Sequence, residues 1–176
     1  MSRADFLVLH YGTFDLLFAR DTLYASTFRK PAQGVEGRAK VIFGNRAIPD
    51  IDLDLYVRHL FPKAVASLPH LGAVCKVSDL EKNQELLEGE ELFALAIPSD
   101  SEVRALELSE FRPLPFHLRP CLDRHGLRAI RFEGLRIQYF CDAGVFIPGC
   151  LIFHHLKGVQ DDHSGGFTFS PVALHA

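Results

Sequence analysis

The densest group of side chains with catalytic potential lies near the C-terminus of the chain. His154 and His155 are followed by Asp161, Asp162 and His163, and imidazoles together with carboxylates can bind a divalent metal ion. Adjacent histidines on a strand point to opposite faces, however, and this group borders a glycine-containing end of the chain. We interpret the group as part of a solvated tail, and a small metal-dependent hydrolase is the least favoured hypothesis.

Two further groups invite a chemical interpretation. Asp50, Asp52 and Asp54 resemble an acidic metal-binding loop, but they alternate with apolar residues, which predicts the polar face of a strand that runs into a helix start. Cys75 paired with a distant histidine would form a thiol dyad, yet it lies in an apolar string that is typical of a buried thiol. We therefore predict no enzymatic activity, no metal ion and no cofactor.

Composition and motifs exclude several other classes of protein. No Gly-x-x-x-x-Gly-Lys, Gly-x-Gly-x-x-Gly or Gly-x-Ser-x-Gly motif occurs in the 176 residues. The formal net charge is −3 and Lys and Arg form no long run, so we expect no nucleic-acid binding. No apolar stretch approaches the roughly 20 residues that span a bilayer, and the N-terminus lacks the form of a secretory signal. We expect a cytoplasmic protein without membrane insertion.

Short strands are the elements that must position any site. Apolar, β-prone segments bounded by turn residues recur along the chain, and no alternation of strand and helix indicates a parallel α/β fold. Strands are predicted at 6–11, 14–18, 23–28, 73–77, 92–97 and 103–108, with a short helix at 53–61 and a short helix or strand at 147–156. The acidic segment 78–90 fits either a hairpin tip or a helical turn, and 111–120, with three prolines, is expected to be an irregular connection.

Two stretches of the sequence have nearly the same pattern of residues. Residues 39–53 and 128–142 each read as an apolar strand, a tight turn, a second apolar strand and an aspartate. The turns are expected at Gly44-Asn45 and Glu133-Gly134, because Gly and Asn tolerate the positive φ that two-residue hairpin loops require. The repeated hairpin predicts two similar β-lobes.

The order of these segments resembles the CheW-like domain of bacterial chemotaxis coupling proteins. The family opens with a strand followed by Gly-x-x-Phe-x-Leu, which here is similar to the stretch from Phe6 to Phe18. Its signature hairpin, Ile-Asn-Leu-Arg-Gly-x-Val-Ile-Pro-Val-Ile-Asp-Leu, is similar to Val41-Ile-Phe-Gly-Asn-Arg-Ala-Ile-Pro-Asp-Ile-Asp-Leu53. Leu114-Pro115 and Phe140-Cys141-Asp142 then follow in the family's order. The resemblance covers residues 4–156 as one domain and leaves 157–176 as a polar, glycine-containing tail.

The resemblance implies an all-β fold of two SH3-like, five-stranded β-barrel lobes with one or two short helices. It also implies a non-enzymatic adaptor that couples a histidine kinase, through its regulatory domain, to the cytoplasmic tip of a chemoreceptor. The protein-binding residues would be Phe43, Gly44, Asn45 and Arg46. The family's arginine falls on Gly44, so its charged contact is either lost or carried by Arg46. The alternative is that the CheW-like fold is reused as an interaction module for another partner.

Overall fold

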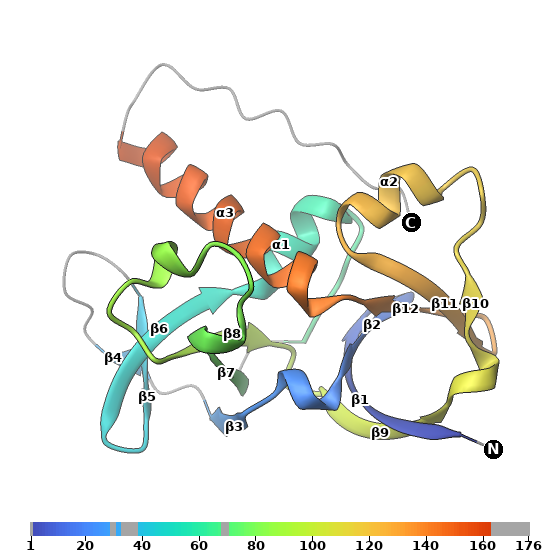
Figure 1. Cartoon of the computed structure of the whole chain (residues 1–176), viewed down its shortest axis with the longest axis horizontal. Helices are drawn as coiled ribbons and strands as arrows, with labels where there is room; N and C mark the ends of the chain where they lie inside the picture. Colours follow the sequence, from blue (N-terminus) through green and yellow to red (C-terminus); the bar gives the residue numbers. More distant parts are fainter. Residues whose placement is uncertain (1, 29–30, 33–38, 68–70, 163–176) are drawn as a thin grey trace.

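Two β-sheets of six strands each form the body of the chain (Figure 1). The computed structural model describes residues 2–28, 31–32, 39–67 and 71–162. The first sheet, in the order β10-β11-β12-β2-β1-β9, consists of β1 (Arg3–Tyr11), β2 (Phe14–Ala19), β9 (Glu102–Glu107), β10 (Arg112–Pro113), β11 (Leu127–Glu133) and β12 (Arg136–Cys141). The second, in the order β3-β7-β8-β6-β5-β4, consists of β3 (Ala25–Phe28), β4 (Pro31–Ala32), β5 (Lys40–Phe43), β6 (Arg46–Asp52), β7 (Leu71–Lys76) and β8 (Leu92–Ile97).

Both sheets have the same pattern of strand pairing. In each, one parallel pair (β12 with β2, β6 with β8) connects strands that are otherwise antiparallel. Each sheet curls, and it has five strands of four or more residues plus one two-residue strand at an edge. The predicted all-β class with two similar five-stranded lobes is therefore confirmed. The first lobe takes strands from both ends of the chain, whereas the second lobe uses only the middle of the chain.

The repeated hairpins lie in different lobes. In the second lobe the loop is Gly44-Asn45, as predicted, with Phe43 paired to Arg46 and Gly44 at φ +60°. In the first lobe the loop is Gly134-Leu135, one residue later than predicted, because β11 continues through Glu133, which pairs with Arg136. A glycine with positive φ at the first loop position fits a type II′ turn in both hairpins.

Each hairpin ends in an aspartate at which a helix begins. The side chain of Asp52 accepts a hydrogen bond from the backbone N–H of Leu55 (2.9 Å) and caps α1 (Leu53–Leu60). The side chain of Asp142 accepts one from the N–H of Gly144 (3.0 Å) at the start of α3 (Ala143–Asp162). The aspartates of 50–54 thus mark the strand-to-helix junction predicted for them.

The helices differ most from the sequence expectations. A short element was predicted at 147–156, but α3 begins at Ala143 and runs through Asp162, into the segment assigned to the tail. Residues 163–176 lie outside the described part of the chain. A further helix, α2 (Arg119–Arg124), follows β10, so the 111–120 connection is partly regular. The acidic segment forms short 3₁₀ turns, η3 (Val77–Asp79) and η4 (Gln84–Leu87); others are η1 (Arg20–Thr22) and η5 (Leu108–Glu110).

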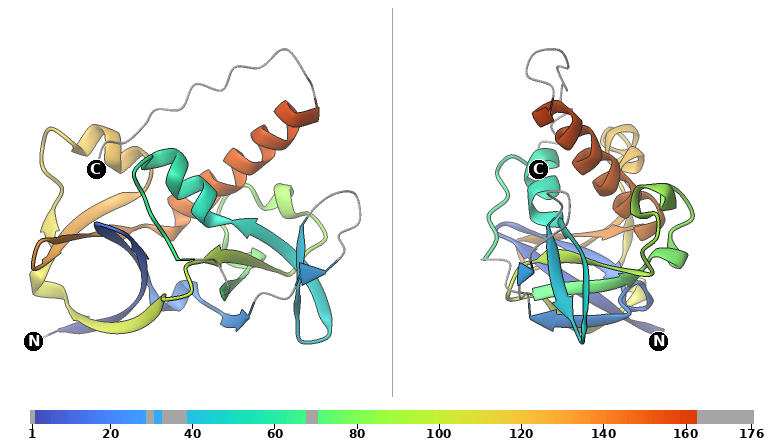
Figure 2. Two further views of the ribbon diagram at one scale, coloured as in Figure 1. Left: turned by 180° about the vertical axis from the view of Figure 1, so that it is seen from behind. Right: turned by 90° about the vertical axis from the view of Figure 1, so that its left-hand side faces the viewer.

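The largest apolar core lies between the two lobes. It joins side chains of β1 and β2 to those of β7 and β8, and α1 and α3 cover it from one side of the sheets (Figures 1 and 2). Strand β1 is buried on both faces: Leu7 and Leu9 enter this shared core, while Phe6 and Val8 fill the interior of the first lobe. The Tyr11 hydroxyl also donates a hydrogen bond to buried Asp54 of α1 (2.7 Å). The two lobes are therefore parts of a single packed body.

No helix in the described residues is long and apolar enough to cross a membrane.

Gly126 provides a test of the junction between α2 and β11. Its φ is +86°, and an added Cβ would lie 3.0 Å from the carbonyl oxygen of Asp142, near the start of α3. We expect Gly126→Ala to destabilise the fold by about 2–4 kcal/mol, since backbone strain of about 1–3 kcal/mol adds to a steric conflict. The midpoint and slope of urea unfolding measure this loss.

Gly89 is the matched control. Its φ is +82°, but an added Cβ would meet nothing within 4 Å. Gly89→Ala therefore carries the backbone strain alone and should cost less than Gly126→Ala. Equal losses for the two variants would show that the close approach at Gly126 relaxes without cost.

Candidate functional site

The structure does not bring the C-terminal histidines and aspartates together as a metal site within the described residues. His154 lies on α3, and its Nε2 is 2.7 Å from the carbonyl oxygen of Asp52, at the start of α1. His155 is exposed on the same helix, and His163 lies outside the described residues. Within the described part of the chain, no group of three or more His, Cys, Asp or Glu side chains could hold a metal ion. His154 thus serves to join two helices.

The cysteines are buried. Cys75 lies in β7 and is 4% exposed, and its burial raises the pKa of the thiol to about 12. Burial also raises the pKa of Cys141 and of Cys150. A thiol nucleophile must ionise near neutral pH, so these three side chains act as small apolar core residues, as the sequence predicted for Cys75. Cys121 is partly exposed on α2.

The hairpin tip predicted to bind partners is accessible. Gly44, Asn45 and Arg46 are exposed, and Phe43 packs partly against the interior of the second lobe. Arg46 Nη1 lies 2.9 Å from Glu91 Oε2, and both side chains are more than half exposed. An exposed ion pair of this kind contributes about 0–1 kcal/mol, so Arg46 can exchange Glu91 for another carboxylate at little cost. Partner binding at these four residues stays a prediction.

A buried polar network, which the sequence analysis did not identify, lies in the first lobe. Asp15 of β2 is fully buried and accepts hydrogen bonds from Gln138 Nε2 (2.9 Å) and Arg136 Nε (2.8 Å), and His10 Nδ1 lies 2.8 Å away. Arg131 extends the network by donating to Gln138 Oε1 (2.5 Å). The available signal was a single acidic residue in an otherwise apolar strand, Phe14-Asp-Leu-Leu-Phe18.

Electrostatics favour the ionised form of Asp15. Burial alone would raise the pKa of its carboxyl, but hydrogen bonds from Arg136, Gln138 and His10 outweigh burial and hold the pKa below its ordinary value of 3.8. The network connects β1, β2 and β12 across the parallel pair of the first sheet. Its groups satisfy one another, which indicates a structural role.

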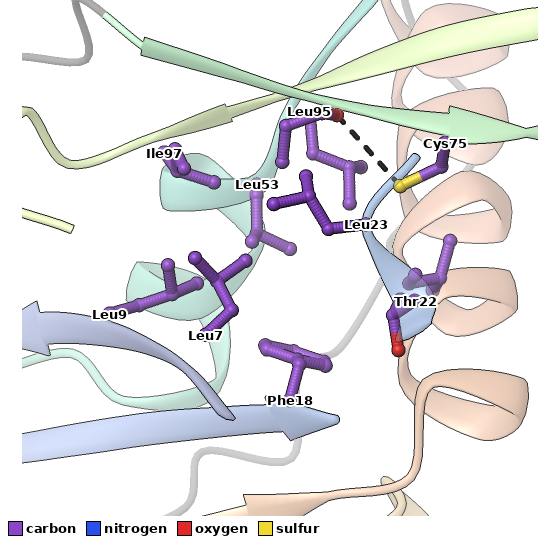
Figure 3. A pocket seen from close by; sticks show the side chains of 11 residues that line it. Leu7, Leu9, Phe18, Thr22, Leu23, Leu53, Cys75, Leu95 and Ile97 are labelled. Carbon is purple, nitrogen blue, oxygen red and sulfur yellow. Dashed lines mark hydrogen bonds between the residues drawn. The ribbon is translucent and has the colours of Figure 1, made fainter. Parts of the chain in front are cut away.

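The space between the lobes is filled. An apolar cavity of about 10 Å³ lies between the sheets, lined by Leu7 and Leu9 of β1, Leu95 and Ile97 of β8, and Leu53 of α1 (Figure 3). A volume of this size is at the lower limit for a single water molecule, and apolar walls offer that water no partner. The cavity is a packing defect in the shared core.

A groove of about 310 Å³ lies beside this core and is open to solvent. Its floor is apolar and includes Cys75, Phe93 and Ile147, which are at most 4% exposed. Its rim is formed by η1, the end of β7, η3 and the first turn of α3. The groove therefore combines strands β7 and β8 of the second lobe with η1 and α3, which follow strands β2 and β12 of the first lobe. A solvent-open groove over a sealed apolar floor can receive a side chain or a short peptide segment.

Comparisons with known proteins identify the fold class. No family model matches the chain, and no curated protein matches it. Among solved structures, the chain is similar to the scaffolding protein TtCheW from Thermoanaerobacter tengcongensis. The TM-score is 0.51 at 10% sequence identity, and the match covers 81% of this chain and 86% of that one. The chain thus has the mostly β fold of a CheW scaffolding protein. At this identity the likeness establishes the fold alone.

Asp15 makes stability depend on pH in a defined direction. Because its pKa is lower in the folded chain than in the unfolded one, its contribution is complete above the ordinary pKa of 3.8 and is lost as pH falls through the lower folded value. We expect Asp15→Asn to cost about 2–4 kcal/mol at pH 7, since it breaks a buried charge-assisted network. We also expect a smaller loss of stability on acidification than in the wild type.

Urea unfolding between pH 2 and pH 7 measures both effects. Asp5→Asn is the control, because Asp5 is an exposed residue of the neighbouring strand β1. It should leave the stability at pH 7 and its decline in acid nearly unchanged. If Asp15→Asn behaved like Asp5→Asn, the network would not stabilise the first lobe.

Proposed function

We propose that the chain is a non-enzymatic adaptor of the chemotaxis type, which couples a histidine kinase to chemoreceptors in the cytoplasm. The observation that carries this proposal is the fold: two lobes with the same pattern of strand pairing, in a chain that matches a CheW scaffolding protein over 81% of its length. The order of segments in the sequence supports the same assignment. The partners would be the regulatory domain of the kinase and the cytoplasmic tip of the receptor.

The shared core suits the chain to this role. An adaptor must hold two partners in a fixed relation, and a rigid surface loses little conformational entropy when it binds. Here the lobes are fixed by a core to which β1, β7, β8, α1 and α3 all contribute. The hairpin tips and the inter-lobe groove are therefore presented with fixed spacing.

Arg46 is the proposed charged contact of the hairpin 43–46. The family's arginine position falls on Gly44, whose φ of +60° strains any L side chain, so restoring an arginine there would disturb the turn. Arg46, two residues later, is exposed and, among the residues that the structure describes, forms its ion pair with Glu91 on the surface. A partner carboxylate would compete with Glu91 for this guanidinium.

A pair of variants tests this contact. Arg46→Ala should weaken binding of the kinase regulatory domain or of the receptor tip by about fivefold or more, as expected for a charged contact of 1–3 kcal/mol. Glu91→Gln should strengthen binding, because it releases Arg46 from its intramolecular partner. Isothermal titration of the wild type and of both variants against each purified partner gives the affinities.

Three outcomes of this titration are informative. Binding by the wild type with opposite shifts in the two variants supports both the adaptor and the contact. Binding that neither variant changes supports the adaptor function but shows that the binding surface does not include Arg46. Absence of binding to both partners by a folded chain contradicts the chemotaxis assignment. That result would favour the alternative, a CheW-like fold reused for another partner, which the loss of the family's arginine at Gly44 already motivates.

A further inference from the structure

The groove at the junction of the lobes has a defined chemical character. We propose that it receives a lysine or arginine side chain from a peptide segment of a partner protein. The inference rests on the adaptor function proposed above and specifies what one of the adaptor's surfaces recognises. The apolar floor, the charges at the rim and the small residues of one wall all favour such a side chain.

The floor can accommodate an aliphatic chain. Phe93 and Ile147 are buried apolar side chains of β8 and α3, and Cys75, whose thiol remains protonated at neutral pH, lies beside them. Thr22 and Cys75 (Figure 3), together with Ile147, also line the small apolar cavity, so the groove lies directly against the shared core. The methylene groups of lysine and arginine commonly pack on such apolar surfaces while their charged ends stay in contact with polar groups.

The charges at the rim select a cation. Asp21 of η1 and Asp79 of η3 are exposed at the rim, and neither forms an ion pair with another of the described residues. The cation at the rim, Lys76, has its ammonium 4.9 Å from the ring centroid of Tyr24. The rim thus has two carboxylates against one ammonium, which disfavours an acidic segment and favours a basic one.

The remaining wall leaves room for the main chain of a peptide. Ala143 and Gly144 form the rim at the start of α3, and a Cβ added to Gly144 would meet only the side chain of Asp142, at 3.3 Å. Small residues allow another backbone to approach closely. These features favour a peptide segment over a free small cation.

The experiment uses two acetylated and amidated hexapeptides as probes, Ala-Val-Arg-Leu-Ala-Val and the matched Ala-Val-Gln-Leu-Ala-Val. Each is titrated at millimolar concentration into the isotopically labelled full chain, and amide chemical shifts are followed by NMR. We expect the arginine peptide to shift the amides of Thr22, Asp79 and Gly144 and to bind at least threefold more tightly than the glutamine peptide. This ratio is the order expected for one exposed charged contact.

Variants and a small-molecule control complete the test. Asp21→Asn combined with Asp79→Asn should remove the preference for arginine, whereas the exposed control Asp5→Asn should preserve it. Equal binding of the two peptides, shifts confined to other surfaces, or an unchanged preference in the double variant would overturn the proposal. Binding of N-acetylarginine amide as tight as that of the arginine peptide would also overturn it, in favour of a small-cation pocket.

This test is independent of the adaptor titration. If the arginine peptide binds the groove but neither chemotaxis partner binds the chain, the groove chemistry holds and the adaptor assignment fails. If the kinase or receptor fragment binds while the peptides show no preference, the adaptor holds and the groove inference fails.

Discussion

The apolar core between the lobes is the constraint on which the rest of the structure depends. Within each lobe the buried apolar cluster is small, four residues in each case, whereas the shared cluster contains side chains of both sheets and of all three helices. Phe14 illustrates the arrangement: it lies in the first lobe but packs against Phe61, just after α1, with ring centroids 4.7 Å apart and the rings tilted by 40°. Neither lobe could bury alone the apolar face that it turns toward the other lobe. Separating the lobes would therefore expose the largest part of the core.

The two lobes share one pattern of parallel and antiparallel strand pairs but have different interiors. The first lobe contains a buried carboxylate, Asp15, that is satisfied by Arg136 and Gln138, while the interior cluster of the second lobe is formed by Val41, Ile48, Val74 and Ala94. A satisfied polar network favours one register of the strands that form it, because any slip would leave charged groups buried without partners. This suggests that the strand pairing of the first lobe, which combines both ends of the chain, is specified by charge as well as by apolar burial.

Local sequence patterns predicted the local features of the fold. Alternating strands around Gly44 and the aspartate after each hairpin identified β5, β6, β11, β12 and the start of α1, since turn and capping preferences act over a few residues. Long-range features were not accessible in this way. The length of α3 depends on packing against α1 and on His154 meeting the carbonyl oxygen of Asp52. The groove depends on η1, η3 and α3 lying close together in space. No local sequence pattern predicts that these distant segments meet.

The most direct test of the adaptor function is a map of the partner surface on the folded chain. Amide shifts of the labelled protein, recorded with and without the unlabelled kinase regulatory domain, would report which residues meet a partner. We expect changes at the hairpin 43–46, at the groove residues Thr22, Asp79 and Gly144, or at both, with the core strands β1 and β8 unchanged. A folded chain that shows no change, or changes confined to the exposed residues of α3 around His155, would contradict it.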